Sequence, residues 1–251
     1  MQIMKTIKLE PHDSIAVLRL ARGVTNAINP EMVAELTDVL AQVADQYRGL
    51  VLAGGPKFLS IGLDLPALLR LDQDRMAAFL DRFHQVVLGL YTLPIPTAAA
   101  ISGHATAGGT ILALGCDFRY IATGKNMMGL NEIQIGLPVP FLVDLLLRQI
   151  VGDRMATEMT YTGRFLLPED AAAAGLVDGV FPAEEVEQKA MEKIAGITPS
   201  RPDAFSLIKK NRVAAVEKNY HQYAESSQAD FLECWFQPGV QKLLHLAAEK
   251  Y

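Results

Sequence analysis

The stretch GHATAGGTILALGCD, residues 103–117, places two glycines directly before an apolar run with helical character. Gly108 and Gly109 follow the apolar segment TAAAISG (97–103), which predicts a buried strand. A glycine pair at such a junction serves either close packing or the presentation of a backbone N–H group to a ligand. The first N–H groups of a helix have no partner within it and suit an anion or a developing oxyanion. The stretch therefore predicts a strand–turn–helix unit with a candidate anion site.

Short apolar segments alternate with helical patterns on both sides of this stretch. Further strands are expected at 14–21 (SIAVLRLA), 49–55 (GLVLAGG) and 117–123 (DFRYIAT), and helices follow Pro30 and cover 79–94. This alternation predicts an α/β protein with a parallel or mixed sheet and crossover helices. From Glu184 the pattern is helical, in four expected segments at 184–197, 202–217, 223–235 and 239–250. We therefore divide the chain into an α/β core, residues 1–183, and a helical region, residues 184–251.

Composition limits the classes of function. Half of the 251 residues are hydrophobic, and the net charge of −5 gives no reason to expect a nucleic-acid partner. The N-terminal MQIMKTIKLEPHDS lacks the apolar core of a signal peptide, and no apolar run is long enough for a membrane span. Cys116 and Cys234 form neither a disulfide framework nor a zinc spacing. We expect a cytoplasmic protein without metal, membrane or nucleic-acid partner.

Several common sites are missing from the sequence. It contains no phosphate loop, no dinucleotide fingerprint and no nucleophile elbow. The five histidines are dispersed, without metal-ligand spacing. His104 lies near the glycine pair, but a hydrogen-bonded loop histidine is the favoured interpretation over catalysis.

A second candidate loop lies in PKFLSIGLDLPALL, residues 56–69. Gly62 can adopt backbone angles closed to other residues, and Asp64 can cap the helix that follows. Either this is an ordinary strand-to-helix turn, or it leaves the N–H group of Leu63 free to donate. If this N–H group and that of Gly108 meet at one point, the two donors would polarise a carbonyl group.

Glu132 is the third element, in MGLNEIQIGLPVPF (128–141). Its apolar neighbours Leu130, Ile133 and Ile135 leave two interpretations open. The carboxylate is either a surface group on an extended run, which the residues alone favour, or a partly desolvated base whose pKa burial would raise.

In this order, the three elements resemble the crotonase superfamily, the enoyl-CoA hydratases and isomerases. The resemblance covers nearly the whole chain and rests on these segments: NAINPEM (26–32), FLSIGLDL (58–65), GHATAGGTILALGCDFRY (103–120), NEIQIGLPVPF (131–141) and AAAAGLVDGVF (171–181). It implies a spiral of ββα units followed by a helical trimerisation region, and hence a homotrimer or a dimer of trimers. It also implies that the backbone N–H groups of Leu63 and Gly108 hold the thioester oxygen of an acyl-CoA, with no further cofactor.

The acid/base positions indicate the reaction. Hydratases of this family use two glutamates, and Ile111 stands where the first would be, while Glu132 matches the second. One carboxylate beside an oxyanion hole suits proton transfer from C2 to C4 of a 3-enoyl-CoA, and the layout is similar to the 3,2-enoyl-CoA isomerase branch. Two alternatives stay open. Glu132 could activate water for hydration, or for thioester hydrolysis helped by His104 or Asp64. The chain could also be a non-catalytic acyl-CoA binder, because Ala107 replaces one glycine of the common triple-glycine form.

The resemblance also gives expected contacts with the substrate. The candidates for substrate and CoA binding are Asn26, Ala27, Ser60, Ile61, Gly62, Asp64, Leu137 and Phe141. An acyl pocket or plain core packing accounts equally well for Ile61, Leu65, Leu68, Leu69, Leu137, Val139 and Phe141. For the basic residues Lys209, Lys210 and Arg212 a solvated helix face is favoured over contact with CoA phosphates. Asp117 and Arg119 are predicted to form a structural charged pair.

Overall fold

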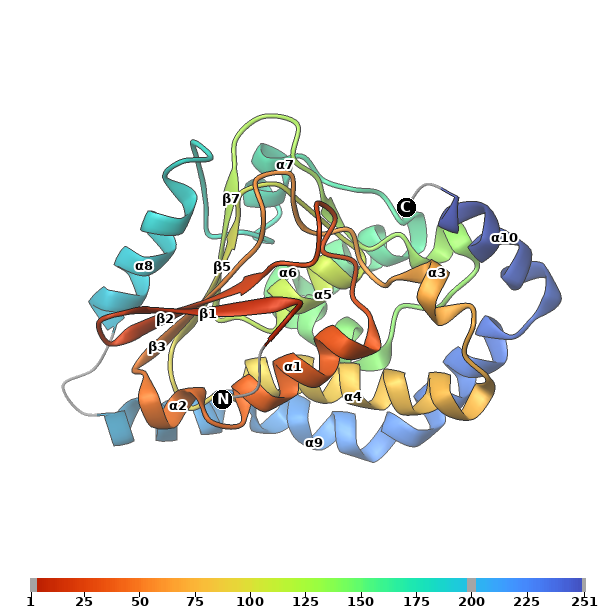
Figure 1. Ribbon diagram of the computed structural model, residues 1–251, viewed down its shortest axis with the longest axis horizontal. Helices are drawn as coiled ribbons and strands as arrows, with labels where there is room; N and C mark the ends of the chain where they lie inside the picture. The colour runs from red at the N-terminus through yellow and green to blue at the C-terminus, as the bar shows by residue number, and fades with distance from the viewer. Residues whose placement is uncertain (1–3, 198–201, 250–251) are drawn as a thin grey trace.

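The computed structural model describes residues 4–197 and 202–249, which contain two sheets (Figure 1). The larger sheet has the strand order β1-β2-β3-β5-β7-β9, and the smaller one the order β4-β6-β8. The larger sheet comprises β1 (Ile7–His12), β2 (Ile15–Leu20), β3 (Gly49–Ala53), β5 (Thr97–Ile101), β7 (Phe118–Ala122) and β9 (Gly179–Phe181). The smaller one comprises β4 (Phe58–Ser60), β6 (His104–Thr106) and β8 (Met128–Gly129). Apart from the antiparallel β1–β2 pair, neighbouring strands run parallel.

The chain builds both sheets in repeated turns of a spiral. After β1, β2, α1 (Pro30–Leu40) and α2 (Val43–Gln46), each turn adds one strand to the larger sheet, one to the smaller sheet, and then a helix. The helices of these turns are α3 (Leu65–Leu68) with α4 (Gln73–Thr92), then α5 (Gly108–Leu114), then the 3-10 helix η1 (Glu132–Ile135) with α6 (Phe141–Thr162). Because every turn passes from the larger to the smaller sheet, the loops after β4, β6 and β8 gather at one end. This confirms the predicted spiral of ββα units.

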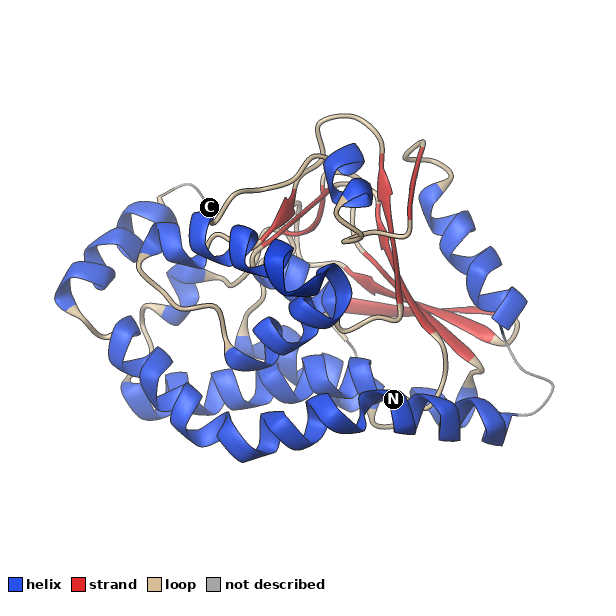
Figure 2. Cartoon of the chain, turned by 180° about the vertical axis from the view of Figure 1, so that it is seen from behind, coloured by secondary structure: helices blue, strands red, loops and turns tan. Residues whose placement is uncertain are grey.

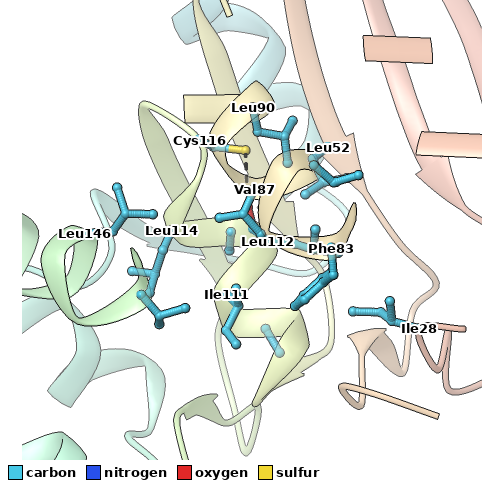
Figure 3. Packing of buried hydrophobic residues seen from close by; sticks show 14 of the residues in the cluster. Ile28, Leu52, Phe83, Val87, Leu90, Ile111, Leu112, Leu114, Cys116 and Leu146 are labelled. Atoms are coloured by element: carbon cyan, nitrogen blue, oxygen red, sulfur yellow. Dashed lines mark hydrogen bonds between the residues drawn. The ribbon is translucent and has the colours of Figure 1, made fainter. Parts of the chain in front are cut away.

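Helices cover the larger sheet on both faces, which explains why its central strands are largely apolar. All residues of β3 and β5 are buried. The short helix α5 is buried along its whole length and packs between α4 and α6. Its Ile111 and Leu112 lie close to Phe83 and Val87, and its Leu114 lies beside Leu146 (Figure 3). Since α5 begins at Gly108, this packing fixes the position of the glycine pair.

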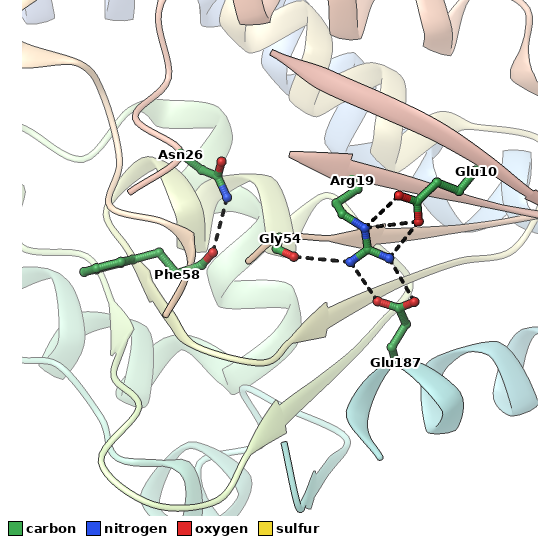
Figure 4. A network of polar contacts seen from close by, with 6 residues as sticks. All are labelled: Glu10, Arg19, Asn26, Gly54, Phe58 and Glu187. Carbon is green, nitrogen blue, oxygen red and sulfur yellow. Dashed lines mark hydrogen bonds and ion pairs between the residues drawn. The ribbon is translucent and has the colours of Figure 1, made fainter. Parts of the chain in front are cut away.

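The predicted boundary at residues 183 and 184 divides elements that pack together. Past it comes α8 (Val186–Ile197), whose Val186, Ala190 and Ile194 pack on the face of the larger sheet opposite α4 and α5. Arg19 of β2 binds Glu187 of α8 through a 2.9 Å ion pair and Glu10 of β1 through one of 2.7 Å (Figure 4). The division into 1–183 and 184–251 stays a prediction.

The C-terminal part confirms the helical pattern but not the number of helices. Figure 2 shows that the first of the remaining C-terminal helices starts beneath the larger sheet and runs to the opposite side of the molecule. They follow α7 (Pro168–Ala173) in the chain and comprise α9 (Pro202–Trp235) and α10 (Pro238–Ala248). The two helices predicted at 202–217 and 223–235 are one helix, and the prediction of a break was wrong. The intervening KNYHQ contains no glycine or proline, and Tyr220 within it is buried.

Two features of the chain bear on its environment. Cys116 and Cys234 are both free thiols. In the described ranges, no helix is both long and apolar enough to span a bilayer. The first three residues of the N-terminal segment considered above lie outside those ranges.

Candidate active site

A cavity of about 500 Å³ lies where the loops of the smaller sheet meet the C-terminal helices. Leu63, Gly108 and Glu132, which come from three successive turns of the spiral, all line it. The other walls come from α4, from the end of α9 and from α10. Its volume is typical of a pocket for a small molecule. The three residues that the sequence singled out therefore line one cavity.

The loop that carries Leu63 is held by backbone and hydroxyl hydrogen bonds. The Ile28 N–H donates to the Gly62 carbonyl at 2.8 Å, and the Asp64 N–H donates to the Ile28 carbonyl at 2.9 Å. The Ser60 hydroxyl donates to the Asn26 carbonyl at 2.7 Å and accepts from the Gly62 N–H at 3.1 Å. Gly62 has a φ of 112°, which residues with a Cβ rarely adopt. Together these contacts fix the direction of the next peptide, the one that bears the Leu63 N–H.

Asp64 fastens the same loop at its other end. Its Oδ1 accepts from the Ala67 N–H at 3.0 Å, so it caps α3 as predicted. Its Oδ2 forms a 2.6 Å ion pair with Arg22, whose guanidinium also donates to the Ala27 carbonyl at 3.0 Å. The carboxylate is thus occupied by structural contacts.

Gly108 begins α5 after a strained residue. Ala107 has φ 46° and ψ −115°, a region that L-residues seldom occupy. Its N–H donates to the Gly129 carbonyl at 2.9 Å, and its carbonyl accepts from the Ile111 N–H at 2.9 Å. The Thr110 hydroxyl lies 2.6 Å from the Ala105 carbonyl and accepts from the Gly129 N–H at 2.9 Å. These hydrogen bonds to β6 and β8 keep Ala107 in its strained conformation.

The N–H groups of Leu63 and Gly108 donate to no acceptor within residues 4–197 and 202–249. The two loops also touch, because a Cβ built on Gly108 would lie 3.1 Å from the Gly62 Cα. Gly108 additionally stands at the positive end of α5. Two unpartnered donors from adjoining loops can together bind the oxygen of a polarised carbonyl group.

Glu132 begins η1 and is only 6% exposed. Its Oε2 is buried and has no hydrogen-bond partner among the described residues. Burial raises the pKa of this carboxyl to about 7, against a weaker opposing effect of its own backbone N–H. Gln134 of the same turn donates to the Gly163 carbonyl at 2.8 Å, which anchors η1 to the end of α6. Glu132 is therefore a desolvated carboxyl and not a surface group, and its role as a base stays a prediction.

Three more predicted residues line the cavity as apolar walls. Ile61, Leu137 and Ile111 all face it, and Ile111 is buried at the position where a second carboxylate was considered. Leu65 also belongs to this lining. Glu132 is therefore the one carboxylate among the described lining residues, and apolar side chains form much of the wall around it.

Other predicted binding residues lie elsewhere. Asn26, Ala27, Ser60, Gly62 and Asp64 do not line the cavity, and they build the loop behind Leu63. The Asn26 side chain is used internally, since its Oδ1 accepts from the Arg22 N–H at 2.8 Å and its Nδ2 donates to the Phe58 carbonyl (Figure 4). Their binding of substrate stays a prediction, with no contact to the cavity in its support.

Four residues considered for the acyl pocket lie outside this cavity, and the substrate contact predicted for Phe141 stays a prediction. Phe141 and Val139 line a different pocket beside α9, where the Phe141 ring meets Tyr223 edge-on at 5.5 Å. Leu68 is fully buried in the core, and Leu69 packs against it. None of the four lines the cavity that holds Glu132. The sequence could not separate these groups, because core and pocket residues are equally apolar.

The basic residues of α9 do not share one environment. Lys209 is 4% exposed and donates to Asp117 Oδ2 at 2.8 Å and to the Ile95 carbonyl at 3.1 Å, so the solvated interpretation is wrong for it. Lys210 and Arg212 are exposed. Asp117 and Arg119 were expected to pair with each other, yet Arg119 instead approaches Asp178 at 3.8 Å. Lys209 and Arg212 line a separate cavity that shares no described residue with the one at Glu132.

His104 has the structural role that the sequence favoured, although it lies in β6 and not in a loop. Its Nδ1 accepts from the Met127 N–H at 3.0 Å, and its ring packs 5.1 Å from that of Phe58. It does not line the cavity. Among the described residues, no group of three or more His, Cys, Asp and Glu side chains could hold a metal ion.

The far walls of the cavity were missed by the sequence analysis. Leu80, Phe83 and His84 come from α4, and Phe231 and Trp235 from α9. The large aromatic side chains read as ordinary core residues at helical spacing, and only the folded chain brings α9 back over α4. Only His84 could have been noticed in the sequence, since it interrupts the apolar face of its helix.

Comparison with known proteins agrees with this fold and site. The family model described as "Enoyl-CoA hydratase/isomerase" matches residues 10–250. The chain therefore belongs to the enoyl-CoA hydratase/isomerase family. It is 30% identical to the mouse mitochondrial enoyl-CoA delta isomerase 1, over 97% of this chain and 86% of the relative. The human enzyme of that name is 28% identical over 94% of this chain and 80% of its own length.

Solved structures extend the likeness to the fold. The crystal structure of human mitochondrial delta3-delta2-enoyl-CoA isomerase matches with a TM-score of 0.93 and 27% identity, over 98% of both chains. An enoyl-CoA hydratase/isomerase from Mycobacterium paratuberculosis, at 20% identity, matches with a TM-score of 0.88 and shows the same fold.

Proposed function

We propose that this chain is a 3,2-enoyl-CoA isomerase that uses Glu132 as its proton carrier. The observation that carries the proposal concerns the described residues: one buried carboxylate lies in the same cavity as two residues whose backbone N–H groups have no partner among them. The names of the mouse and human relatives, both enoyl-CoA delta isomerases, support it.

The oxyanion hole consists of the N–H groups of Leu63 and Gly108. Both donate to the thioester oxygen and stabilise the negative charge that develops there when C2 loses its proton. Each such donor contributes about 3–4 kcal/mol to transition-state stabilisation in comparable sites. The hydrogen-bonded loops that carry Leu63 and Gly108 hold both donors in place before the substrate binds. The donors therefore do not have to move during the reaction.

Glu132 removes a proton from C2 of the 3-enoyl thioester and returns it to C4. The C2–H bond breaks, the double bond moves from C3–C4 to C2–C3, and a C4–H bond forms. A carboxyl group with a pKa of about 7 can both accept and release a proton near neutral pH. A positioned base of this kind contributes roughly 10²–10⁴-fold in rate.

Water addition has less support in this cavity. Ile111 supplies no second carboxylate to hold a water molecule. His104 and Asp64, considered as helpers for thioester hydrolysis, do not line the cavity and have structural partners. The apolar residues Ile61, Leu65 and Leu137 leave room for an acyl chain beside Glu132.

The test is an assay of purified protein with a medium-chain 3-enoyl-CoA, following the absorbance of the conjugated enoyl thioester. Growth of that absorbance, without release of free thiol, is the expected result. Thiol release without conjugation would instead indicate a hydrolase. Tight binding with neither product would indicate a non-catalytic binder.

The oligomeric state and the cellular compartment are further parts of the proposal. Leu207 and Ile208 on α9 are each about 60% exposed, and such apolar side chains suit an interface between copies of the chain. A homotrimer or a dimer of trimers, formed through the helical C-terminal region, accounts for them. The two free thiols suit a reducing compartment such as the cytoplasm. The mass of the assembly in solution tests the first point.

A further inference from the structure

Two buried side-chain atoms lack a hydrogen-bond partner in the described chain, and both belong to residues of the same cavity. One is Glu132 Oε2, which the proposed reaction uses, and the other is His84 Nε2. Buried polar groups without partners are rare and costly, so each requires an explanation. The proposed function gives no role to His84.

His84 stands in an apolar and aromatic wall. It is 6% exposed, and its ring lies 6.3 Å from that of Phe83 and meets Tyr220 edge-on at 6.3 Å. Leu80 and Phe83 of the same helix line the cavity with it. Burial lowers the pKa of His84 to about 4, against an opposing effect of Asp81, so the ring is neutral near pH 7. A neutral imidazole has one N–H donor and one acceptor nitrogen.

The other polar side chains of the cavity differ from His84. The Thr106 hydroxyl donates to the Ile61 carbonyl at 2.8 Å, and Gln134 is bound to the Gly163 carbonyl. Asn131 is only partly buried. An isolated water molecule beside His84 would need two to four polar partners, which aromatic rings do not supply. A polar atom of a bound ligand is therefore the better hydrogen-bond partner for His84 Nε2.

We propose that His84 is a specificity-determining residue that hydrogen-bonds a hydroxyl group on the acyl chain of the substrate. The inference rests on the proposed function and names its preferred substrates, the hydroxylated 3-enoyl-CoA thioesters. A hydroxyl group both donates and accepts, so it satisfies either tautomer of the imidazole, whereas a carbonyl oxygen satisfies only one. An unsubstituted chain leaves the buried nitrogen unpaired and loses that hydrogen bond.

The experiment compares kcat/KM for an unsubstituted 3-enoyl-CoA with a series that carries a hydroxyl group at successive carbons beyond C4. At least one hydroxylated chain is expected to be preferred roughly ten-fold by the wild type. His84→Leu should abolish that preference, by lowering kcat/KM for the hydroxylated chain and raising it for the unsubstituted one. His84→Gln, which keeps a donor and an acceptor, should restore part of it. His221→Gln, on the exposed face of α9, is the matched control and should keep the wild-type preference.

Calorimetric affinities for saturated acyl-CoA and hydroxyacyl-CoA separate this inference from the proposed function. A hydroxyl preference in binding that depends on His84, without any isomerisation, would overturn the isomerase and keep the specificity assignment. Isomerisation with no hydroxylated chain preferred by the wild type, or with the same preference in His84→Leu, would overturn the assignment. If His84→Leu does not fold, the wild-type series and His84→Gln decide.

Discussion

Gly62 and Gly108 pack so closely that a Cβ built on Gly62 would lie 3.1 Å from the amide nitrogen of Gly108. The contact joins the loop after β4 to the start of α5, two segments from successive turns of the spiral. It holds the backbones of Leu63 and Gly108, two residues of the cavity wall, close together. The glycines are thus required by the approach of two backbones, and the donors depend on that approach.

Gly108→Ala is expected to separate the two loops. The added methyl group would lie 3.0 Å from Ile28 Cδ1 and 3.1 Å from the Gly62 Cα, and backbone cannot yield as a flexible side chain does. We expect kcat to fall about 10²-fold, as for the loss of one oxyanion donor, and unfolding to become easier by about 1–3 kcal/mol. Steady-state kinetics and denaturant unfolding measure the two effects.

Gly196→Ala in α8 is the matched control for that variant. A Cβ there meets no atom of the described residues within 4 Å, so activity should persist and stability should rise by about 0.5–1 kcal/mol. Full activity in Gly108→Ala would mean that the close approach of the loops is not needed for the reaction.

The burial of Glu132 predicts a pH-dependent stability cost. Its pKa rises from 4.5 in the unfolded chain to about 7 in the folded protein, so between these values the folded state binds more protons. Stability therefore falls as pH rises through this window and levels off above it. The free energy of unfolding falls by about 3 kcal/mol at most.

Glu132→Gln removes this cost and is expected to unfold at a higher temperature than the wild type at pH 8, but not at pH 4.5. The comparison isolates Glu132 because His84, the other titratable group named in the cavity wall, has a pKa of about 4 and stays neutral through most of the window. Thermal unfolding of both proteins at several pH values measures it. A constant difference between them across this range would contradict the assigned pKa.

Lys209 is expected to matter for stability and not for binding CoA. Lys209→Met leaves Asp117, which is 26% exposed, without its cation and should cost roughly 2–4 kcal/mol. Lys210→Met, on the exposed side of α9, should change stability by less than about 0.5 kcal/mol. Chemical unfolding checks both, with KM for acyl-CoA as the parallel measurement. A raised KM in Lys209→Met with unchanged stability would restore the role in binding CoA phosphates.

Much of the fold follows from apolar periodicity. The strands β2, β3, β5 and β7 are five or six residues long, and buried runs of this length are distinctive. The smaller sheet escaped prediction from the residues because its strands are only two or three residues long. β1 was missed because its side chains are largely exposed and Pro11 interrupts it, both usual for an edge strand.

Site residues could be predicted from the sequence only where the conformation of the backbone, and not the side chain, shapes the site. Gly62 and Gly108 carry a signal in the sequence because a Cβ is disfavoured at the φ of Gly62 and has no room where the two loops approach each other. Glu132 was ambiguous, since its surroundings include α10, which contacts η1 but lies far along the chain. Asn26 and Asp64 were assigned to substrate, yet their side chains are used to hold the loop behind Leu63.

The most direct test of the account is the isomerase activity of Glu132→Gln, measured beside its affinity for a saturated acyl-CoA. Glutamine keeps the size of the side chain but cannot carry the proton. We predict that kcat falls by about 10²–10⁴-fold while the affinity changes no more than a few-fold. A variant that keeps more than about a tenth of the wild-type rate would contradict the claim that this single buried carboxylate moves the proton.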